Sequence, residues 1–86
     1  MQIQYHKHFE KRFTKLQPQI KKKVILTIQQ FTKNPFNPKL RNHALTARLS
    51  GQRAISVMGD LRIIFEEHDH YVLVIMLDVG THNQVY

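Results

Sequence analysis

The chain has 86 residues, no cysteine and a formal net charge of +7. A chain of this length buries one hydrophobic core, so we expect a single domain over residues 1–86. The lack of cysteine excludes a disulfide framework and thiolate metal sites. The longest apolar run, Tyr71–Leu77, is far shorter than the ~20 residues of a membrane-spanning helix. Residues 1–4, followed by charged residues, do not have the pattern expected of a signal peptide. We therefore expect a cytoplasmic protein.

The first half of the chain predicts a strand followed by two helices. Apolar residues alternate with glutamines over residues 2–5, which is typical of a short strand. From His6 to Leu16 the apolar spacing becomes helical. A second helix begins at Pro18, which suits the first helical turn, and ends before Asn34-Pro35. Its apolar stripe consists of Ile20, Val24, Ile28 and Phe31.

The second half predicts three strands in a meander. Residues 34–38 form a turn-rich connector, and residues 39–51 show no clean period and are expected to form an ordered loop. Strands are predicted over 53–58, over 61–67 and from Tyr71 onward, separated by turns at 59–60 and 68–70. The last strand is apolar on both sides, which favours a central position in the sheet. We expect an α+β fold of order β-α-α-β-β-β, with both helices on one face of an antiparallel sheet.

Alternation also predicts which side chains form the core. Ile55 and Val57 share one face of their strand, and Leu61, Ile63 and Phe65 share one face of the next strand. We expect these residues to pack against the stripe of the second helix. Arg62, Ile64 and Glu66 are then left on the opposite face of the sheet.

The charge is divided unevenly along the chain. Residues 1–53 carry twelve Lys and Arg against one acid, Glu10, a net of +11, whereas residues 54–86 carry Arg62 against five acids, a net of −4. A basic region of this kind is typical of proteins that bind phosphate backbones. A solubilising surface, an anionic membrane surface and an acidic protein partner are the alternatives.

Four side chains near the last two strands could carry chemistry. Asp60 and Arg62 stand two residues apart and therefore point to the same face of a strand. His82 and Tyr86 follow the last strand. An acid, a cation, an imidazole and a phenol are the groups needed to cleave RNA without a metal. Asp60 could instead be a turn residue, and Arg62 could form a structural pair with Glu66.

Four segments, taken in order, resemble the RelE/ParE superfamily of bacterial toxin–antitoxin toxins, and in particular its RelE and YafQ mRNA endonuclease branches. These segments are Asn42–Leu45, Leu49–Arg53, Gly59–Phe65 and Gly80–Tyr86. The resemblance covers the whole chain and implies a RelE-like fold. It also implies a toxin that inhibits translation by cleaving mRNA.

The resemblance implies an active site drawn from both branches. His82, His43 and Asp60 match active-site residues of YafQ-like toxins, whereas Arg62 and Tyr86 match residues of RelE. In the expected reaction a ribose 2′-hydroxyl attacks the adjacent phosphate, with His82 as general acid and Arg62 stabilising the phosphate charge. An imidazole exchanges protons near neutral pH, which suits the acid role. The general base is left open between Asp60 and His43, and Tyr86 is either a base or a stacking platform.

The expected partners follow from the charge and the resemblance. Arg41, Arg48 and Arg53 are candidates for gripping RNA phosphates, and Lys21, Lys22 and Lys23 form a further basic group. The resemblance implies mRNA held in the ribosomal A site and a cognate antitoxin that forms a hetero-oligomer with the toxin. We expect no metal and no cofactor. Two alternatives stay open, namely a ParE-like toxin that acts on DNA gyrase and a non-catalytic RNA-binding module.

Overall fold

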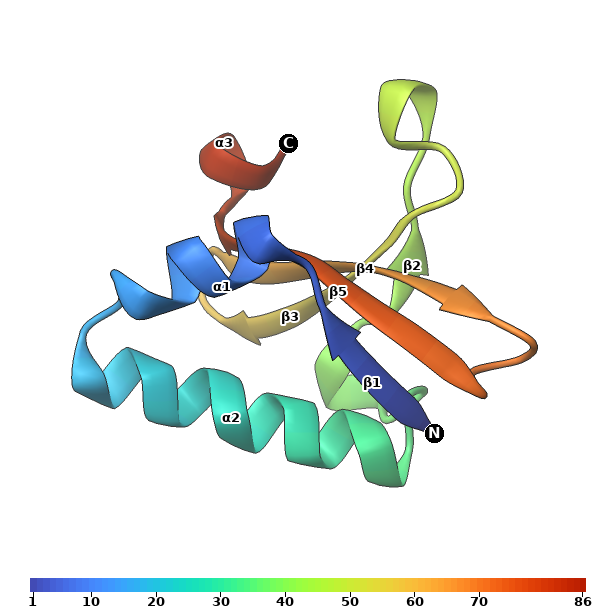
Figure 1. The fold of residues 1–86 in the computed structure, drawn as a ribbon, viewed down its shortest axis with the longest axis horizontal. Helices are drawn as coiled ribbons and strands as arrows, with labels where there is room; N and C mark the ends of the chain where they lie inside the picture. The colour runs from blue at the N-terminus through green and yellow to red at the C-terminus, as the bar shows by residue number, and fades with distance from the viewer.

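The computed structural model describes residues 1–86 and shows an α+β fold (Figure 1). The strands are β1 (Gln2–Tyr5), β2 (His43–Ala44), β3 (Arg53–Met58), β4 (Leu61–His68) and β5 (Leu73–Thr81). The helices are α1 (Lys7–Thr14), α2 (Pro18–Lys33) and α3 (His82–Val85), with two 3₁₀ turns, η1 (Pro38–Leu40) and η2 (Ala47–Leu49). No helix combines the length and the apolar character that crossing a membrane would require.

The five strands form one sheet in the order β1-β5-β4-β3-β2. The pairs from β2 to β5 are antiparallel, as predicted for β3, β4 and β5. The central strand is β4, whereas β5, for which a central position was expected, is the interior strand between β1 and β4. The exception to antiparallel pairing is β1, which runs parallel to β5 with Ile3 opposite Val74. Parallel pairing needs a long connection between the strands, and the helices and the rest of the chain provide one.

The main core lies between α2 and the sheet. Ring centroids of Phe31 on α2 and Phe65 on β4 are 4.9 Å apart, and both side chains are fully buried. The predicted packing of the second helix on the strand faces is confirmed for most of the expected residues. Ile28 and Val57 pack at the margin of this core, and Ile20 is not part of it. The ten buried members are Phe9, Val24, Phe31, Leu40, Ile55, Ile63, Phe65, Val74, Met76 and Val79.

A second, smaller apolar cluster lies on the other face of the sheet. Ala54 and Ile64 are buried there beneath Val85 of α3. Leu45, Leu77 and Tyr86 pack against this cluster. Figure 1 shows α2 on one side of the sheet, with α3 and the segment between β2 and β3 on the other. The two faces therefore carry different elements.

Three local features differ from the sequence prediction. Asp69, His70 and Tyr71 all have positive φ, so the turn is longer than predicted and β5 starts at Leu73 instead of Tyr71. The expected loop over 39–51 contains β2 and η2 and the end of η1. Helix α3 was not predicted, because four residues are too few to show a helical period.

The aromatic contact in the main core predicts the cost of truncation there. Phe31→Ala would leave a cavity against Phe65 and should lower the free energy of unfolding by about 3–5 kcal/mol. Leu26→Ala is the matched control on the same helix, because Leu26 is 56% exposed. It should change that free energy by less than about 0.5 kcal/mol. Urea denaturation measures both, and equal effects would contradict the assigned helix face.

Candidate active site

Helix α3 begins with His82 and is followed by Tyr86 as its C-cap residue, and two hydrogen bonds hold its first turn. The backbone N–H of Thr81 donates to Gln84 Oε1 at 2.9 Å, which forms part of a capping box. The backbone N–H of His82 donates to Asp60 Oδ2 at 3.3 Å. A carboxylate near a helix N-terminus also interacts favourably with the helix dipole. The Asp60 side chain therefore fixes the backbone of His82.

Gly80 allows α3 to lie close to β5. A Cβ at this position would lie 2.7 Å from Gln84 Oε1 and 3.2 Å from Gln84 Cβ, so the Gln84 side chain would have to move and its hydrogen bond with the Thr81 N–H would be disturbed. Gly80 is also the cross-strand neighbour of Arg62 on β4. The close approach therefore places α3 directly beside the strand position of Arg62.

His82 and Tyr86 contact each other on α3. Their ring centroids are 4.3 Å apart with the planes nearly perpendicular, and the spacing of four residues brings them to one helix face. The His82 side chain is exposed, whereas Tyr86 packs on the cluster of Ala54 and Ile64. The Tyr86 hydroxyl is buried and has no hydrogen-bond partner. Such a group is rare in a folded protein, and a catalytic role is one of the explanations for it.

The guanidinium of Arg62 has only neutral partners. It donates to Ser56 Oγ at 2.9 Å and to the Gly59 carbonyl at 3.1 Å. The structural pair with Glu66 that the sequence left open does not form, since Glu66 pairs with His68 instead. The positive charge of Arg62 is thus held in place but not neutralised, which suits an anion arriving from outside.

His43 lies on the same face of the sheet as Arg62. It pairs with Ala54, which pairs with Ile64, and opposite residues of antiparallel strands share a face. Its Nδ1 lies 2.8 Å from the Arg41 carbonyl oxygen. Because a carbonyl oxygen only accepts, the neutral ring carries its proton on Nδ1 and leaves Nε2 free to accept one.

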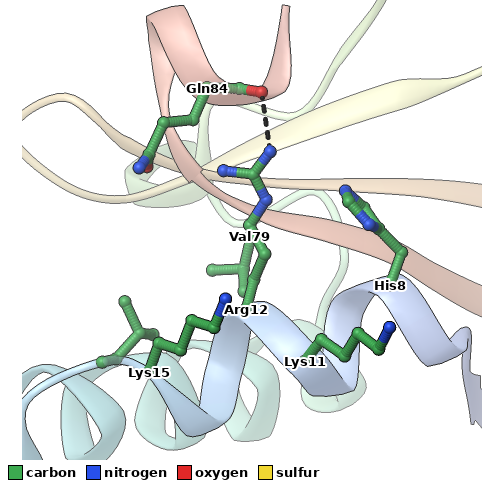
Figure 2. A pocket seen from close by; sticks show the side chains of 7 residues that line it. His8, Lys11, Arg12, Lys15, Val79 and Gln84 are labelled. Atoms are coloured by element: carbon green, nitrogen blue, oxygen red, sulfur yellow. Dashed lines mark hydrogen bonds between the residues drawn. The ribbon is translucent and has the colours of Figure 1, made fainter.

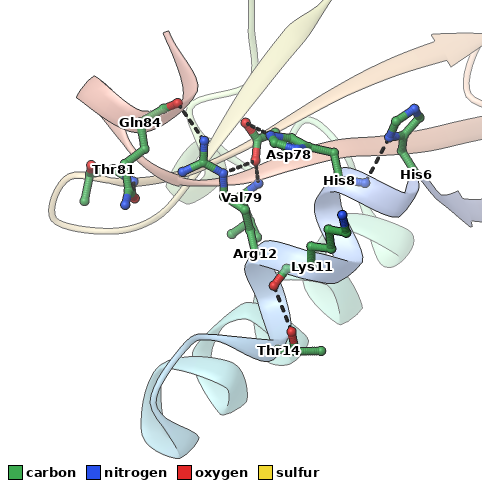
Figure 3. A network of polar contacts seen from close by, with 9 residues as sticks. All are labelled: His6, His8, Lys11, Arg12, Thr14, Asp78, Val79, Thr81 and Gln84. Atoms are coloured by element: carbon green, nitrogen blue, oxygen red, sulfur yellow. Dashed lines mark hydrogen bonds and ion pairs between the residues drawn. The ribbon is translucent and has the colours of Figure 1, made fainter.

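An ion-pair network ties α1 to β5 and α3 (Figure 3). The Arg12 Nε atom lies 3.0 Å from Asp78 Oδ1, and His8 Nε2 lies 3.3 Å from Asp78 Oδ2. A terminal nitrogen of Arg12 also donates to the Gln84 carbonyl oxygen at 3.1 Å. Sequence reasoning missed Arg12, although its spacing of four residues from His8 indicates a shared helix face.

The structure divides the candidate RNA-binding residues between the two faces. Arg48 lies on the segment that rises beside the sheet on the α3 side, and Arg41 adjoins His43. Arg53 lies two residues before Ile55 and therefore shares its face, on the α2 side, where the Arg53 Nε donates to Asn42 Oδ1 at 2.9 Å. The lysine triplet lies on α2. The structure therefore does not bring Arg53 or Lys21, Lys22 and Lys23 together with His82 and Arg62.

Two hollows border α3. A cleft of about 540 Å³ separates α3 from α1, and a groove of about 260 Å³ lies on the sheet face beside Val85. Figure 2 shows the cleft with the side chains of α1 that line it. No group of three or more His, Asp or Glu side chains is arranged so that it could hold a metal ion.

A family model described as "Bacterial toxin of type II toxin-antitoxin system, YafQ" matches residues 1–86. The chain belongs to this family. This finding confirms the resemblance inferred from the four sequence segments. No curated protein matches the chain in sequence.

Solved structures show the same fold. YafQ from E. coli strain BL21(DE3) superposes with a TM-score of 0.82 at 23% identity, covering 98% of this chain and 96% of that one. A YoeB/ParE toxin from Agrobacterium tumefaciens has a TM-score of 0.79 at 10% identity, covering 95% and 99%. The E. coli DinJ–YafQ complex contains a chain with a TM-score of 0.71 at 23% identity, covering 98% and 96%. At these identities the likeness concerns the fold.

The unpaired hydroxyl of Tyr86 yields a stability prediction. Tyr86→Phe removes a buried oxygen that has no partner, so the free energy of unfolding should stay the same or rise by up to about 1 kcal/mol. Tyr86→Ala, which also removes the ring from the cluster on the sheet, should lower it by roughly 3 kcal/mol. Urea denaturation distinguishes the two. A clear loss of stability in Tyr86→Phe would show that the hydroxyl is bonded in the free protein.

Proposed function

We propose that the protein is an endoribonuclease that cleaves mRNA on the ribosome by attack of the ribose 2′-hydroxyl on the adjacent phosphate, with no metal. Membership of the YafQ toxin family and the geometry around α3 support the proposal. The single observation that carries it is the placement of α3 over Gly80, the cross-strand neighbour of Arg62. The helix that carries His82, the proposed proton donor, thus lies beside the strand position of Arg62, which has no carboxylate partner.

Each side chain has a role that follows from its surroundings. Arg62 binds the non-bridging oxygens and stabilises the charge that builds up on them. His82 is exposed on α3 and donates a proton to the leaving 5′-oxygen. His43 accepts the proton of the 2′-hydroxyl through Nε2, because its Nδ1 is already bonded to the Arg41 carbonyl. Tyr86 orients the His82 ring by contact, and its hydroxyl has no hydrogen-bond partner within the protein.

The role of Asp60 is to position His82. Its carboxylate contacts the backbone N–H of His82 and not the imidazole. This arrangement favours His43 as the general base, of the two residues that the sequence left open. Ser56 has a similar supporting role, because its hydroxyl holds the guanidinium of Arg62.

The physiological partner in this proposal is an antitoxin encoded with the toxin. The E. coli DinJ–YafQ pair, which includes a chain similar to this one, is described as a toxin–antitoxin complex. A net charge of +7 favours an acidic antitoxin segment and also favours ribosomal RNA. The protein would act in the cytoplasm, where ribosomes and mRNA are present.

Loss of the proton donor predicts a large drop in cleavage. His82→Ala should retain its fold, since the ring is exposed, and should cleave mRNA ~10²–10⁴-fold more slowly. The measurement is mRNA integrity in a translating extract, with plasmid supercoiling read in parallel. Intact mRNA with altered supercoiling in the wild-type reaction would favour a gyrase-directed toxin. An inert wild-type protein that binds RNA would favour a non-catalytic module.

A pair of substitutions at Asp60 separates positioning from proton transfer. Asp60→Asn keeps an oxygen that can accept from the His82 backbone and should retain most of the activity. Asp60→Ala removes the acceptor, lets α3 shift and should reduce the cleavage rate by roughly 10²-fold. Single-turnover cleavage rates provide the comparison. Equal losses in the two variants would make Asp60 a proton-transfer group instead.

A further inference from the structure

Helix α1 presents a stripe of basic side chains to α3. His8, Lys11, Arg12 and Lys15 follow the spacing i, i+3, i+4, i+7, which places them on one helix face. They line the cleft of about 540 Å³ together with Leu16, Val79 and Gln84, as Figure 2 shows for the labelled residues. The cleft is therefore basic along one wall and borders α3, which carries His82, on the other.

The charges in this cleft are not balanced. No carboxylate lines the cleft, and the nearby Asp78 already pairs with Arg12 and His8 through its two oxygens. Lys11 and Lys15 have no carboxylate within ion-pair distance, and Glu10 of the same helix lines a different hollow. Like charges four residues apart destabilise a helix. An anion bound in the cleft would relieve this repulsion.

The cleft adjoins the groove on the sheet face. His8 lines both hollows, and the adjacent residues Gln84 and Val85 of α3 each line one of them. The groove is floored by Ile64 and Leu77, on the face of the sheet that also carries Arg62. A polymer lying across this face beside α3 thus has a path into the cleft.

We propose that the cleft between α1 and α3 binds a backbone phosphate of the RNA strand, at a nucleotide other than the one that is cleaved. Lys11 and Lys15 supply the free positive charge, and Arg12 holds the wall of the cleft by joining Asp78 to the Gln84 carbonyl. The choice of RNA as the ligand rests on the proposed function. It adds a binding site on α1 that lies apart from the residues that transfer protons.

Equilibrium binding to a single-stranded 2′-O-methyl RNA tests the site without cleavage, because this probe lacks the attacking hydroxyl. Lys11→Gln/Lys15→Gln should weaken binding about ten-fold near physiological ionic strength. It should also reduce the slope of log K against log salt by about 0.7 for each phosphate that is no longer neutralised. Lys33→Gln/Lys39→Gln removes the same charge from exposed positions elsewhere and should weaken binding less than about two-fold, since only the long-range field changes. Circular dichroism confirms that both variants are folded.

The outcomes separate this site from the proposed chemistry. The cleft proposal would be overturned if both double variants weakened binding equally or if neither weakened it. It would also be overturned if the wild type did not bind the probe. A variant that loses affinity for a polyglutamate peptide but not for RNA would also overturn it, in favour of an acidic protein segment. If the wild type binds the probe through Lys11 and Lys15 but leaves cleavable RNA intact, the cleft proposal is supported and the nuclease proposal fails.

Discussion

The docking of α3 on β5 is the constraint on which the candidate site depends. Gly80 permits it, since a Cβ there would displace the Gln84 side chain, which forms the capping box with Thr81 at the first turn of the helix. Asp60 holds the start of α3, and Arg12 holds the Gln84 carbonyl near its end. A four-residue helix has little stability of its own. The position of His82 is therefore a consequence of tertiary contacts from β5, the β3–β4 turn and α1.

The main core and the candidate site lie on opposite faces of the sheet. One face packs on α2 and contains most of the buried side chains, including the contact between Phe31 and Phe65. The other face is only partly covered, with a small cluster of Ala54, Ile64 and Val85 beneath α3. This division explains the apolar character of both sides of β5. It also leaves Arg62 at a position where a ligand can reach it.

Much of the fold could be predicted because its elements follow clear periods. The stripe of α2 and the alternation of β3 and β4 identified most of the core, and the side of Arg62 followed from the same alternation. The apolar run that starts at Tyr71 predicts a strand there, whereas the positive φ of Tyr71 shows that this residue belongs to the preceding turn. The parallel pairing of β1 and the existence of α3 depend on contacts between distant segments, which no local pattern contains.

Only part of the candidate site could be predicted, because the sequence names residues but not the contacts between distant segments. Sequence motifs identified His82, Arg62 and Tyr86, and the structure shows the contacts that position them. The motifs could not show that Asp60 contacts a backbone N–H, or that Ser56 holds Arg62. The face of Arg53 follows from its alternation with Ile55, but its place next to a basic loop suggested an RNA contact. The basic stripe of α1 could not be recognised as one wall of a cleft from the sequence, because α3, the other wall, lies far from it along the chain.

The most direct test of the proposed mechanism is cleavage of an RNA that carries a single 2′-deoxy nucleotide at the position of cutting, compared with the all-ribose RNA. The ribose substrate should yield a 2′,3′-cyclic phosphate and a 5′-hydroxyl, and the deoxy substrate should not be cut at that position. Cleavage of the deoxy substrate at the same position would overturn the mechanism, because the attacking group would then have to come from water or from the protein.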